Sequence, residues 1–379
     1  MTDPAFRNGT FVGRVWRPEF GGPSLVTIRD GAIHDITSKA TPTMRDLLEL
    51  ADPVTYVRTA SGERLSALDD CLARKADPSH VHLIAPPDLQ AIKACGVTFA
   101  RSMIERVIEE RAAGDASRAE AIRARVIAVI GDSLRNLKPG SLQAARVKAA
   151  LIEEGVWSQY LEVGIGPDAE VFTKAQVLSS VGHGADVGLH PASHWNNPEP
   201  EVVLAVSSSG QVRGATLGND VNLRDIEGRS ALLLGKAKDN NASCAIGPFI
   251  RLFDETYTID DVRRAELTLT VQGEDGYRLA GRSSMAEISR DPLDLVAQTI
   301  GPHHQYPDGL MLFMGTLFAP VEDRDEPGQG FTHKLGDVVT IANPELGRLT
   351  NTVRHSTACA PWSFGAAALM RNLSGRGLL

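Results

Sequence analysis

Two glutamates stand at the entry of a continuous apolar run, in the stretch Glu199-Pro200-Glu201-Val202-Val203-Leu204-Ala205-Val206. The apolar run predicts a β-strand, and in a strand the side chains of residues i and i+2 point to the same face. Glu199 and Glu201 are therefore expected to lie side by side. Two neighbouring carboxylates repel each other and resist burial unless a cation or a proton compensates them.

A third carboxylate is expected to join this pair. Asp220 lies 19 residues after Glu201, which leaves room for the first strand, a turn at 208–210 and a returning strand over Val212–Leu217. Such a hairpin brings the three carboxylates together, and Lys238 follows 18 residues beyond Asp220. Carboxylate oxygens are the ligands of a hard divalent cation such as Mg²⁺. The spacing alone leaves two interpretations open, a metal site or a solvated acidic edge of a sheet.

Around this stretch the apolar pattern changes along the chain. From Phe99 to Glu154 it has the four-residue period of helices, and beyond Trp157 short β-like runs alternate with Gly-, Asn- and Asp-rich connections. We therefore expect an α+β protein with a helical segment over about 99–155 and mixed β-structure after it. The runs that predict later strands are Val202–Val206, Leu267–Val271, Leu310–Phe313 and Val338–Ile341.

The N-terminal part is predicted to be a small β-rich domain. Residues 24–29 and 32–36 have strand composition and flank Asp30-Gly31, a favourable two-residue hairpin turn. A Pro-rich, polar stretch at 76–87 is typical of a boundary between units. We expect a small domain over 1–85 and a catalytic domain over 86–379, which agrees with two domains for a chain of 379 residues.

The overall composition excludes several classes of protein. The chain is 42% hydrophobic and 23% charged, a globular mixture, and its formal net charge of −8 argues against binding to nucleic acid. It has no apolar run long enough to span a membrane. Residues 1–7 do not look like a signal peptide, and the four widely spaced cysteines form no disulfide or zinc pattern. These features predict a cytoplasmic protein with reduced, buried thiols.

An ordered series of motifs resembles the fumarylacetoacetate hydrolase family from about residue 87 to about residue 375. Several spaced motifs in the right order are more specific than any one of them. The matching segments are Phe172-Thr173-Lys174, Ser179-Ser180-Val181-Gly182, Glu199 with Glu201, residues 219–225, Lys238, Pro307-Asp308-Gly309, Gly315-Thr316 and residues 336–339.

The resemblance implies a mixed-β catalytic domain with a bound divalent metal. Its implied Mg²⁺ ligands are Glu199, Glu201 and Asp220, and Mn²⁺ is a possible substitute. It also implies that Lys238 and Thr316 face the substrate, and Ser102 and Ser180 are further candidates for substrate contacts.

One departure from the family pattern indicates the branch. Hydrolases of the family carry a Gly-x-Asn-Tyr-x-x-His-x-x-Glu segment whose His and Glu activate water. In the matching residues 96–105 the Glu remains as Glu105, but Ser102 takes the place of the His. Serine alone is no base near pH 7. With the acidic Glu170 before Phe172, the short Glu201–Asp220 spacing and the long helical segment, the chain is similar to the 2-keto-3-deoxy-pentonate (xylonate or arabinonate) dehydratases.

That branch implies Mg²⁺-dependent dehydration of a 2-keto-3-deoxy-pentonate to 2,5-dioxopentanoate, in sugar-acid catabolism. We expect Lys238 as the base that removes a C3 proton, provided that its pKa is lowered, and Glu170 or else Glu105 as the acid. The alternatives are a C–C bond hydrolase of an acylpyruvate or β-diketo acid, and an inactive metal-binding scaffold. We also expect a homo-oligomer, a dimer or tetramer.

Overall fold

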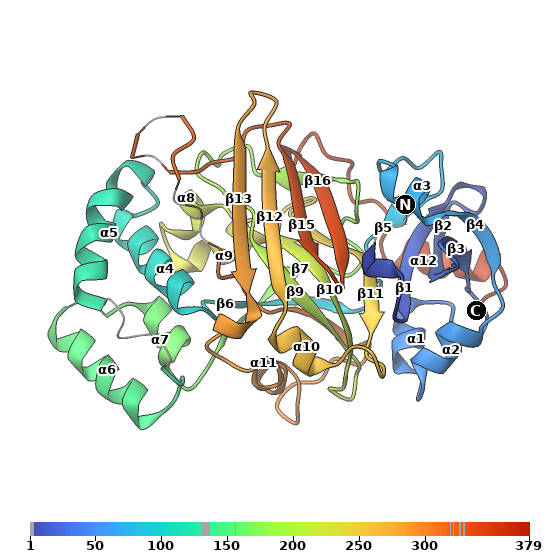
Figure 1. The fold of residues 1–379 in the computed structure, drawn as a ribbon, viewed down its shortest axis with the longest axis horizontal. Helices are drawn as coiled ribbons and strands as arrows, with labels where there is room; N and C mark the ends of the chain where they lie inside the picture. Colours follow the sequence, from blue (N-terminus) through green and yellow to red (C-terminus); the bar gives the residue numbers. More distant parts are fainter. Residues whose placement is uncertain are drawn as a thin grey trace.

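The computed structural model describes residues 4–130, 137–155, 157–318, 320, 322–325, 327–328 and 330–379, with the side chains of 125–130 left out, so Met1–Asp3 of the N-terminal stretch lie outside the described part. Within that part, two β-sheets form the centre of the molecule, with helices at one end and the N- and C-terminal segments at the other (Figure 1). This mixed α+β architecture confirms the fold class predicted from the sequence.

The larger sheet has eleven strands. They are β1 (Phe11–Arg17), β2 (Gly22–Arg29), β3 (Ala32–Asp35), β4 (Glu63–Ala67), β5 (His82–Ile84), β6 (Ala91–Gly96), β7 (Glu170–Ala175), β9 (Pro200–Val206), β10 (Val212–Asp220), β11 (Cys244–Leu252) and β14 (Leu310–Phe313). Their order is β4-β3-β2-β1-β11-β10-β9-β14-β6-β7, and β5 pairs with β1. Strand β9 is buried along its whole length, because both faces of the sheet are covered there.

The smaller sheet has five strands and covers one of those faces. It consists of β8 (Asp186–Leu189), β12 (Glu266–Gln272), β13 (Arg278–Ser284), β15 (Val338–Asn343) and β16 (Gly347–His355), in the order β13-β12-β15-β16-β8. Strand β12 is buried at alternate residues, as expected for a strand with one solvent face. Its Leu269 packs with Leu204 of β9 in the core between the sheets.

Four helices form a separate layer beside the sheets, at the left of Figure 1. They are α4 (Ala100–Ala112), α5 (Ala116–Ile130), α6 (Leu142–Glu153) and α7 (Gln159–Ile165), and they share a core that includes Met103, Val107 and Leu161. Ser141 caps α6 by accepting a hydrogen bond from the N–H of Ala144. The predicted helical segment over about 99–155 is therefore confirmed, as three helices.

The other helices are short and lie between strands or at the C-terminus. They are α1 (Met44–Glu49), α2 (Pro53–Thr59), α3 (Leu68–Ala73), α8 (Arg224–Glu227), α9 (Leu234–Lys238), α10 (Ile259–Arg263), α11 (Pro292–Thr299) and α12 (Ala366–Gly375), with 3₁₀ turns at Pro4–Phe6, Pro18–Phe20, Ala231–Leu233 and Met285–Glu287. None of the described helices is long and apolar enough to cross a membrane.

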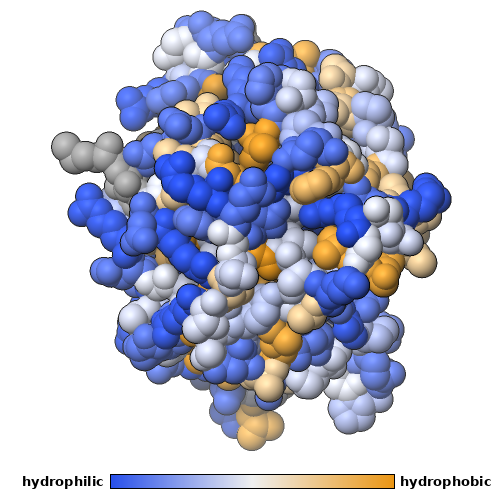
Figure 2. Space-filling model, turned by 90° about the vertical axis from the view of Figure 1, so that its right-hand side faces the viewer, coloured by the Kyte–Doolittle hydropathy of each residue, from blue (hydrophilic) through white to orange (hydrophobic). Residues whose placement is uncertain are grey.

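The N-terminal strands continue the larger sheet, because β1 pairs antiparallel with β11. The predicted hairpin is present: β2 and β3 pair across Asp30 and Gly31, whose φ angles of 48° and 68° are those of a tight hairpin turn. Helix α12 lies against β2, where Arg376 donates a hydrogen bond to the carbonyl of Pro23 at 2.6 Å. Figure 2 shows this end of the molecule as hydrophilic, with small scattered apolar patches. A boundary near residue 85 stays a prediction.

Candidate metal centre and active site

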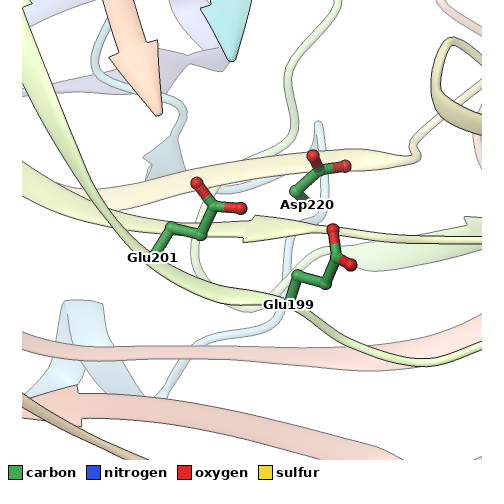
Figure 3. Close-up of side chains that lie close together, drawn as sticks. All are labelled: Glu199, Glu201 and Asp220. Carbon is green, nitrogen blue, oxygen red and sulfur yellow. The ribbon is translucent and has the colours of Figure 1, made fainter. Parts of the chain in front are cut away.

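The hairpin of β9 and β10 brings three carboxylates together, as Figure 3 shows. Glu201 lies in β9, Glu199 is the residue directly before β9, and Asp220 is the last residue of β10. The strands pair in antiparallel register with Gly218 opposite Glu201, and the N–H of Asp220 donates to the carbonyl of Glu199 at 3.1 Å. One oxygen from each carboxylate lies within 4.8 Å of the others, and all three residues are buried. The arrangement agrees with the hairpin spacing read from the sequence.

Two buried lysines hold Asp220 and Glu199. The ammonium of Lys238, at the end of α9, lies 2.6 Å from Glu199 Oε2 and 3.1 Å from Asp220 Oδ2. The ammonium of Lys174, on β7, lies 2.8 Å from Asp220 Oδ1, and the Lys174 side chain is fully buried. In the sequence Lys174 belongs to one of the family motifs, without a predicted role.

Glu201 has a different environment. Within the described part of the chain no cationic side chain forms a salt bridge with it, and its carboxylate accepts one hydrogen bond, from the N–H of Gly315 at 2.6 Å. Gly315 has φ 86°, and a Cβ there would lie 2.0 Å from Thr98 Oγ1. Burial, Asp220 and Glu199 raise the pKa of Glu201 well above its usual value.

The donor set therefore fits a hard divalent cation. Three buried carboxylates converge, and the one without a salt bridge carries an unfavourable charge that a cation would compensate. Oxygen-only donors of this kind suit Mg²⁺ or Mn²⁺ and fit zinc or copper less well. Glu199, Glu201 and Asp220 are the residues that would hold the ion.

The carboxylates border a polar pocket between the larger sheet, α4 and α8. Of the residues that sequence analysis singled out for roles other than metal binding, Ser102, Glu105, Glu170, Lys238 and Thr316 line this pocket. Ser180 does not line it. Its hydroxyl lies behind the site, 3.9 Å from the thiol of Cys244, which pairs with Asp220 across β10 and β11.

Glu170 begins β7 and lies opposite Gly96 of β6. Burial is the first cause that raises the pKa of Glu170, and Glu199 and Asp220 act in the same direction, while Arg106 and Lys238 oppose the rise. The protonated form is thus favoured, which is the form that a general acid needs.

Glu105, on α4, is bound by guanidinium groups. Arg123 of α5 binds both of its oxygens, at 2.9 and 3.1 Å, and Arg224 lies 3.7 Å away. A carboxylate fixed between two guanidinium groups is poorly suited to donate a proton. This environment was not visible in the sequence, where Glu105 was the second choice of acid.

Glu227, on α8, is a pocket residue that sequence analysis missed. It is buried, and burial raises its pKa to about 7, although Arg106, at 3.1 Å, and Lys238 oppose the rise. The only signal in the sequence is an acidic residue that directly follows the apolar Ile226 in the segment after Asp220. Alone, that signal does not distinguish a pocket acid from a surface one.

The surroundings of Lys238 differ from the expectation of a lowered pKa. Although burial lowers the pKa of this ammonium, Asp220, Glu199 and Glu227 raise it above the usual value in total. Lys238 is therefore protonated in this arrangement, in which its ammonium bridges two of the carboxylates. The base role thus depends on those carboxylates being engaged by another cation.

The two remaining candidates line the pocket through satisfied hydroxyls. Ser102 donates a hydrogen bond to the carbonyl of Phe99 at 2.9 Å, and Thr316 accepts one from the N–H of Phe318 at 3.0 Å. The hydroxyl of Ser102 is thus bound to the first turn of its own helix, and within the described part of the chain it forms no hydrogen bond with a side chain that could act as a base.

The fold agrees with known proteins. Residues 167–354 match the family described as fumarylacetoacetate (FAA) hydrolase, C-terminal. A solved structure of 2-keto-3-deoxy-D-arabinonate dehydratase, complexed with magnesium and 2,5-dioxopentanoate, is similar with a TM-score of 0.64 and 21% identity, covering 91% of this chain and 99% of that one. The family match over these residues confirms the resemblance to the fumarylacetoacetate hydrolase family that the motifs predicted.

Two curated relatives carry dehydratase names. The chain is 27% identical over 335 residues to a protein of Haloferax volcanii named probable 2-keto-3-deoxyxylonate dehydratase, covering 88% of this chain and 96% of the relative. It is 29% identical over 185 residues to the 2-dehydro-3-deoxy-D-arabinonate dehydratase of Saccharolobus solfataricus, covering 49% of this chain and 58% of that protein.

Proposed function

We propose that this protein is a Mg²⁺-dependent hydro-lyase that dehydrates a 2-keto-3-deoxy-pentonate, of the xylonate or arabinonate type, to 2,5-dioxopentanoate. The observation that carries the proposal is the convergence of Glu199, Glu201 and Asp220 beside Lys238 and Glu170 in one buried pocket. The dehydratase names of both curated relatives support the same reaction class.

The divalent cation belongs at the three carboxylates, where, when bound, it supplies Lewis-acid polarisation of the 2-keto acid and so acidifies the C3 protons. The protein's contribution is to hold these carboxylates rigidly. Asp220 is held by Lys174 at 2.8 Å, and Glu201 by the N–H of Gly315 at 2.6 Å. Mn²⁺ offers a similar preference for oxygen ligands and is expected to substitute.

Lys238 is the proposed base. Its ammonium would leave Glu199 and Asp220 when these carboxylates hold a cation, and the loss of both ion pairs would remove the two largest of the interactions that raise its pKa. Its burial then favours the neutral amine. The amine accepts a proton from C3 of the substrate.

Glu170 is the proposed acid. Burial raises its pKa and so favours the protonated carboxyl, which donates its proton to the C4 hydroxyl as that group leaves as water. Loss of the C3 proton and of the C4 hydroxyl leaves a C3–C4 double bond. Transfer of a proton from C5 to C3 then gives a C4–C5 enol. Loss of the enol hydroxyl proton with protonation of C4 yields the terminal aldehyde, so that one water is lost and all five carbons are kept. Glu227, in the same pocket, is the alternative donor.

Hydrolysis of a carbon–carbon bond is the competing function, and the pocket offers less for it. A hydrolase needs a base for water, but Ser102 is bound to Phe99 and Glu105 is bound by Arg123. An acylpyruvate substrate therefore serves as the comparison in the assay.

The test supplies racemic 2-keto-3-deoxy-pentonate with Mg²⁺ or with EDTA, coupled to a semialdehyde dehydrogenase. We expect aldehyde formation that EDTA abolishes, and a loss of about 100-fold or more in K238M and E170Q. Lys93→Met, a lysine on the outer part of β6, is the matched control and should retain activity. Release of pyruvate from acylpyruvate, with no aldehyde from the pentonate, would contradict the proposal.

Location and assembly accompany this proposal. We infer a cytoplasmic enzyme and a homo-oligomer, a dimer or tetramer, that binds neither nucleic acid nor membrane. The net charge of −8 supports the first exclusion, and the described helices, none of which can span a membrane, support the second. Size-exclusion chromatography with light scattering measures the oligomer number.

A further inference from the structure

Arg106, on α4, connects the helical layer to the metal centre. Its guanidinium lies 2.6 Å from Glu199 Oε1 through one nitrogen, and 2.6 Å from Glu109 and 3.1 Å from Glu227 through another. The side chain is only 12% exposed. One cation therefore binds three buried carboxylates, and one of them is a candidate metal ligand.

The two oxygens of Glu199 have different partners. Oε1 is bound by Arg106, and Oε2 is bound by Lys238 at 2.6 Å. In the proposed reaction Lys238 must release Glu199, whereas Arg106 has no role that takes it away. Arg106 is thus the contact that keeps the Glu199 carboxylate in place while the other oxygen faces the centre.

Arg106 is itself held from its far side. Glu109 Oε2 accepts from Arg106, and Glu109 Oε1 accepts from Nε of Arg224 at 2.6 Å. Arg224 also donates to the carbonyl of Pro320 at 2.9 Å. This chain of contacts joins α4, α8 and the 320 region, so the guanidinium that holds Glu199 has little freedom to turn.

We propose that Arg106 is a positioning residue of the metal centre, which orients Glu199 through the fork of its guanidinium. The inference rests on the proposed function, because it assumes that Glu199 ligates the ion. The proposed effect of Arg106 is geometric. Charge alone predicts the opposite effect, because the guanidinium repels a divalent ion and removing Arg106 would then tighten metal binding. Partners that orient a metal ligand typically change affinity about 10- to 100-fold when they are removed.

The test measures metal binding without turnover, on the metal-free protein. Mg²⁺ is titrated by calorimetry and Mn²⁺ by the electron paramagnetic resonance of the free ion, in wild type, R106M, R106K and R111M. Arg111 lies on the same helix, is exposed, and contacts the carbonyl of Gly155, so it is the matched control. Thermal melting of each metal-free variant shows whether it is folded.

We expect R106M to bind both ions about 10- to 100-fold more weakly than wild type, and R106K to be weaker by a smaller factor, since an ammonium cannot span Glu199, Glu109 and Glu227. R111M should bind normally. At saturating Mg²⁺, R106M should recover much of the wild-type kcat. The Mg²⁺ concentration that gives half-maximal activity should remain higher than in wild type. R106K keeps a positive charge in the buried site. If R106M does not fold, the metal affinity of R106K tests the proposal.

Binding in folded R106M or R106K that equals or exceeds wild type would overturn the inference, and a lowered melting temperature with unchanged metal affinity would assign Arg106 a structural role only. The proposed function fails separately. If wild type binds no Mg²⁺, both proposals are wrong, but if wild type binds Mg²⁺ and dehydrates the pentonate while the variants bind equally well, only the role of Arg106 is lost.

Discussion

The carboxylate of Glu170 occupies the space that a side chain at Gly96 would need. The two residues are paired across β7 and β6, and a Cβ on Gly96 would lie 2.0 Å from Glu170 Oε2. The absence of a side chain at residue 96 therefore determines where the proposed acid lies.

Gly96→Ala is expected to displace the Glu170 carboxylate and to lower kcat about 100-fold, because small displacements of a catalytic group have effects of that size. The clash is with the end of a flexible side chain, so stability should change little. Steady-state kinetics and thermal melting separate the two effects. Gly375→Ala, at a glycine with no neighbour within 4 Å of the added Cβ, is the control. Full activity in G96A would show that Glu170 does not act from this position.

Glu201→Gln should weaken metal binding and stabilise the metal-free protein. Burial, Asp220 and Glu199 raise the pKa of Glu201, so at neutral pH this carboxyl group carries a cost that a neutral amide avoids. The amide oxygen can still accept a hydrogen bond from the N–H of Gly315. We expect the metal-free variant to be more stable by about 1–2 kcal/mol, and its Mg²⁺ affinity to fall at least about 100-fold. Urea unfolding in EDTA and calorimetric titration measure these quantities. A destabilised E201Q would contradict the description of Glu201 as a strained charge.

Glu227 should make stability depend on pH. Its pKa is raised to about 7 in the folded protein, so its contribution is present below the unfolded value of 4.5 and is lost as the pH rises through 7. Ionisation costs about 1.4 kcal/mol for each pH unit between the two values, or about 3 kcal/mol in total. Urea unfolding of wild type and E227Q in EDTA, at pH 5 and pH 8, should show the wild type losing that much more stability. Parallel losses would mean that the pKa is not raised.

Lys174→Met should destabilise the protein by about 3–5 kcal/mol, because it leaves the buried Asp220 without one of its two ammonium partners. The ammonium of Lys174 also donates to the backbone carbonyl of Lys238, so the base should be displaced as well. Denaturant unfolding measures the loss, with K93M again as the control. Recovery of stability in the double variant K174M/D220N would confirm that the unpaired carboxylate is the cause. A K174M protein as stable as wild type would exclude this role.

Local sequence was sufficient for the centre of the site. Glu199, Glu201 and Asp220 come from one β-hairpin. Their proximity follows from the two-residue period of a strand and from the number of residues in the hairpin. The same local rules predicted the turn at Asp30-Gly31. Motif order was sufficient for the family.

Tertiary structure decided the environment of each group. The pairing of Glu105 with Arg123, the burial of Glu227 and the place of Ser180 behind the site depend on how α4, α5, α8 and β11 pack, which no local pattern encodes. The pairing of β1 with β11 joins residues about 240 apart in the chain. The direction of the pKa shift of Lys238 also depends on tertiary structure. Burial lowers this pKa and neighbouring carboxylates raise it, and only their arrangement in space determines which of the two effects is larger.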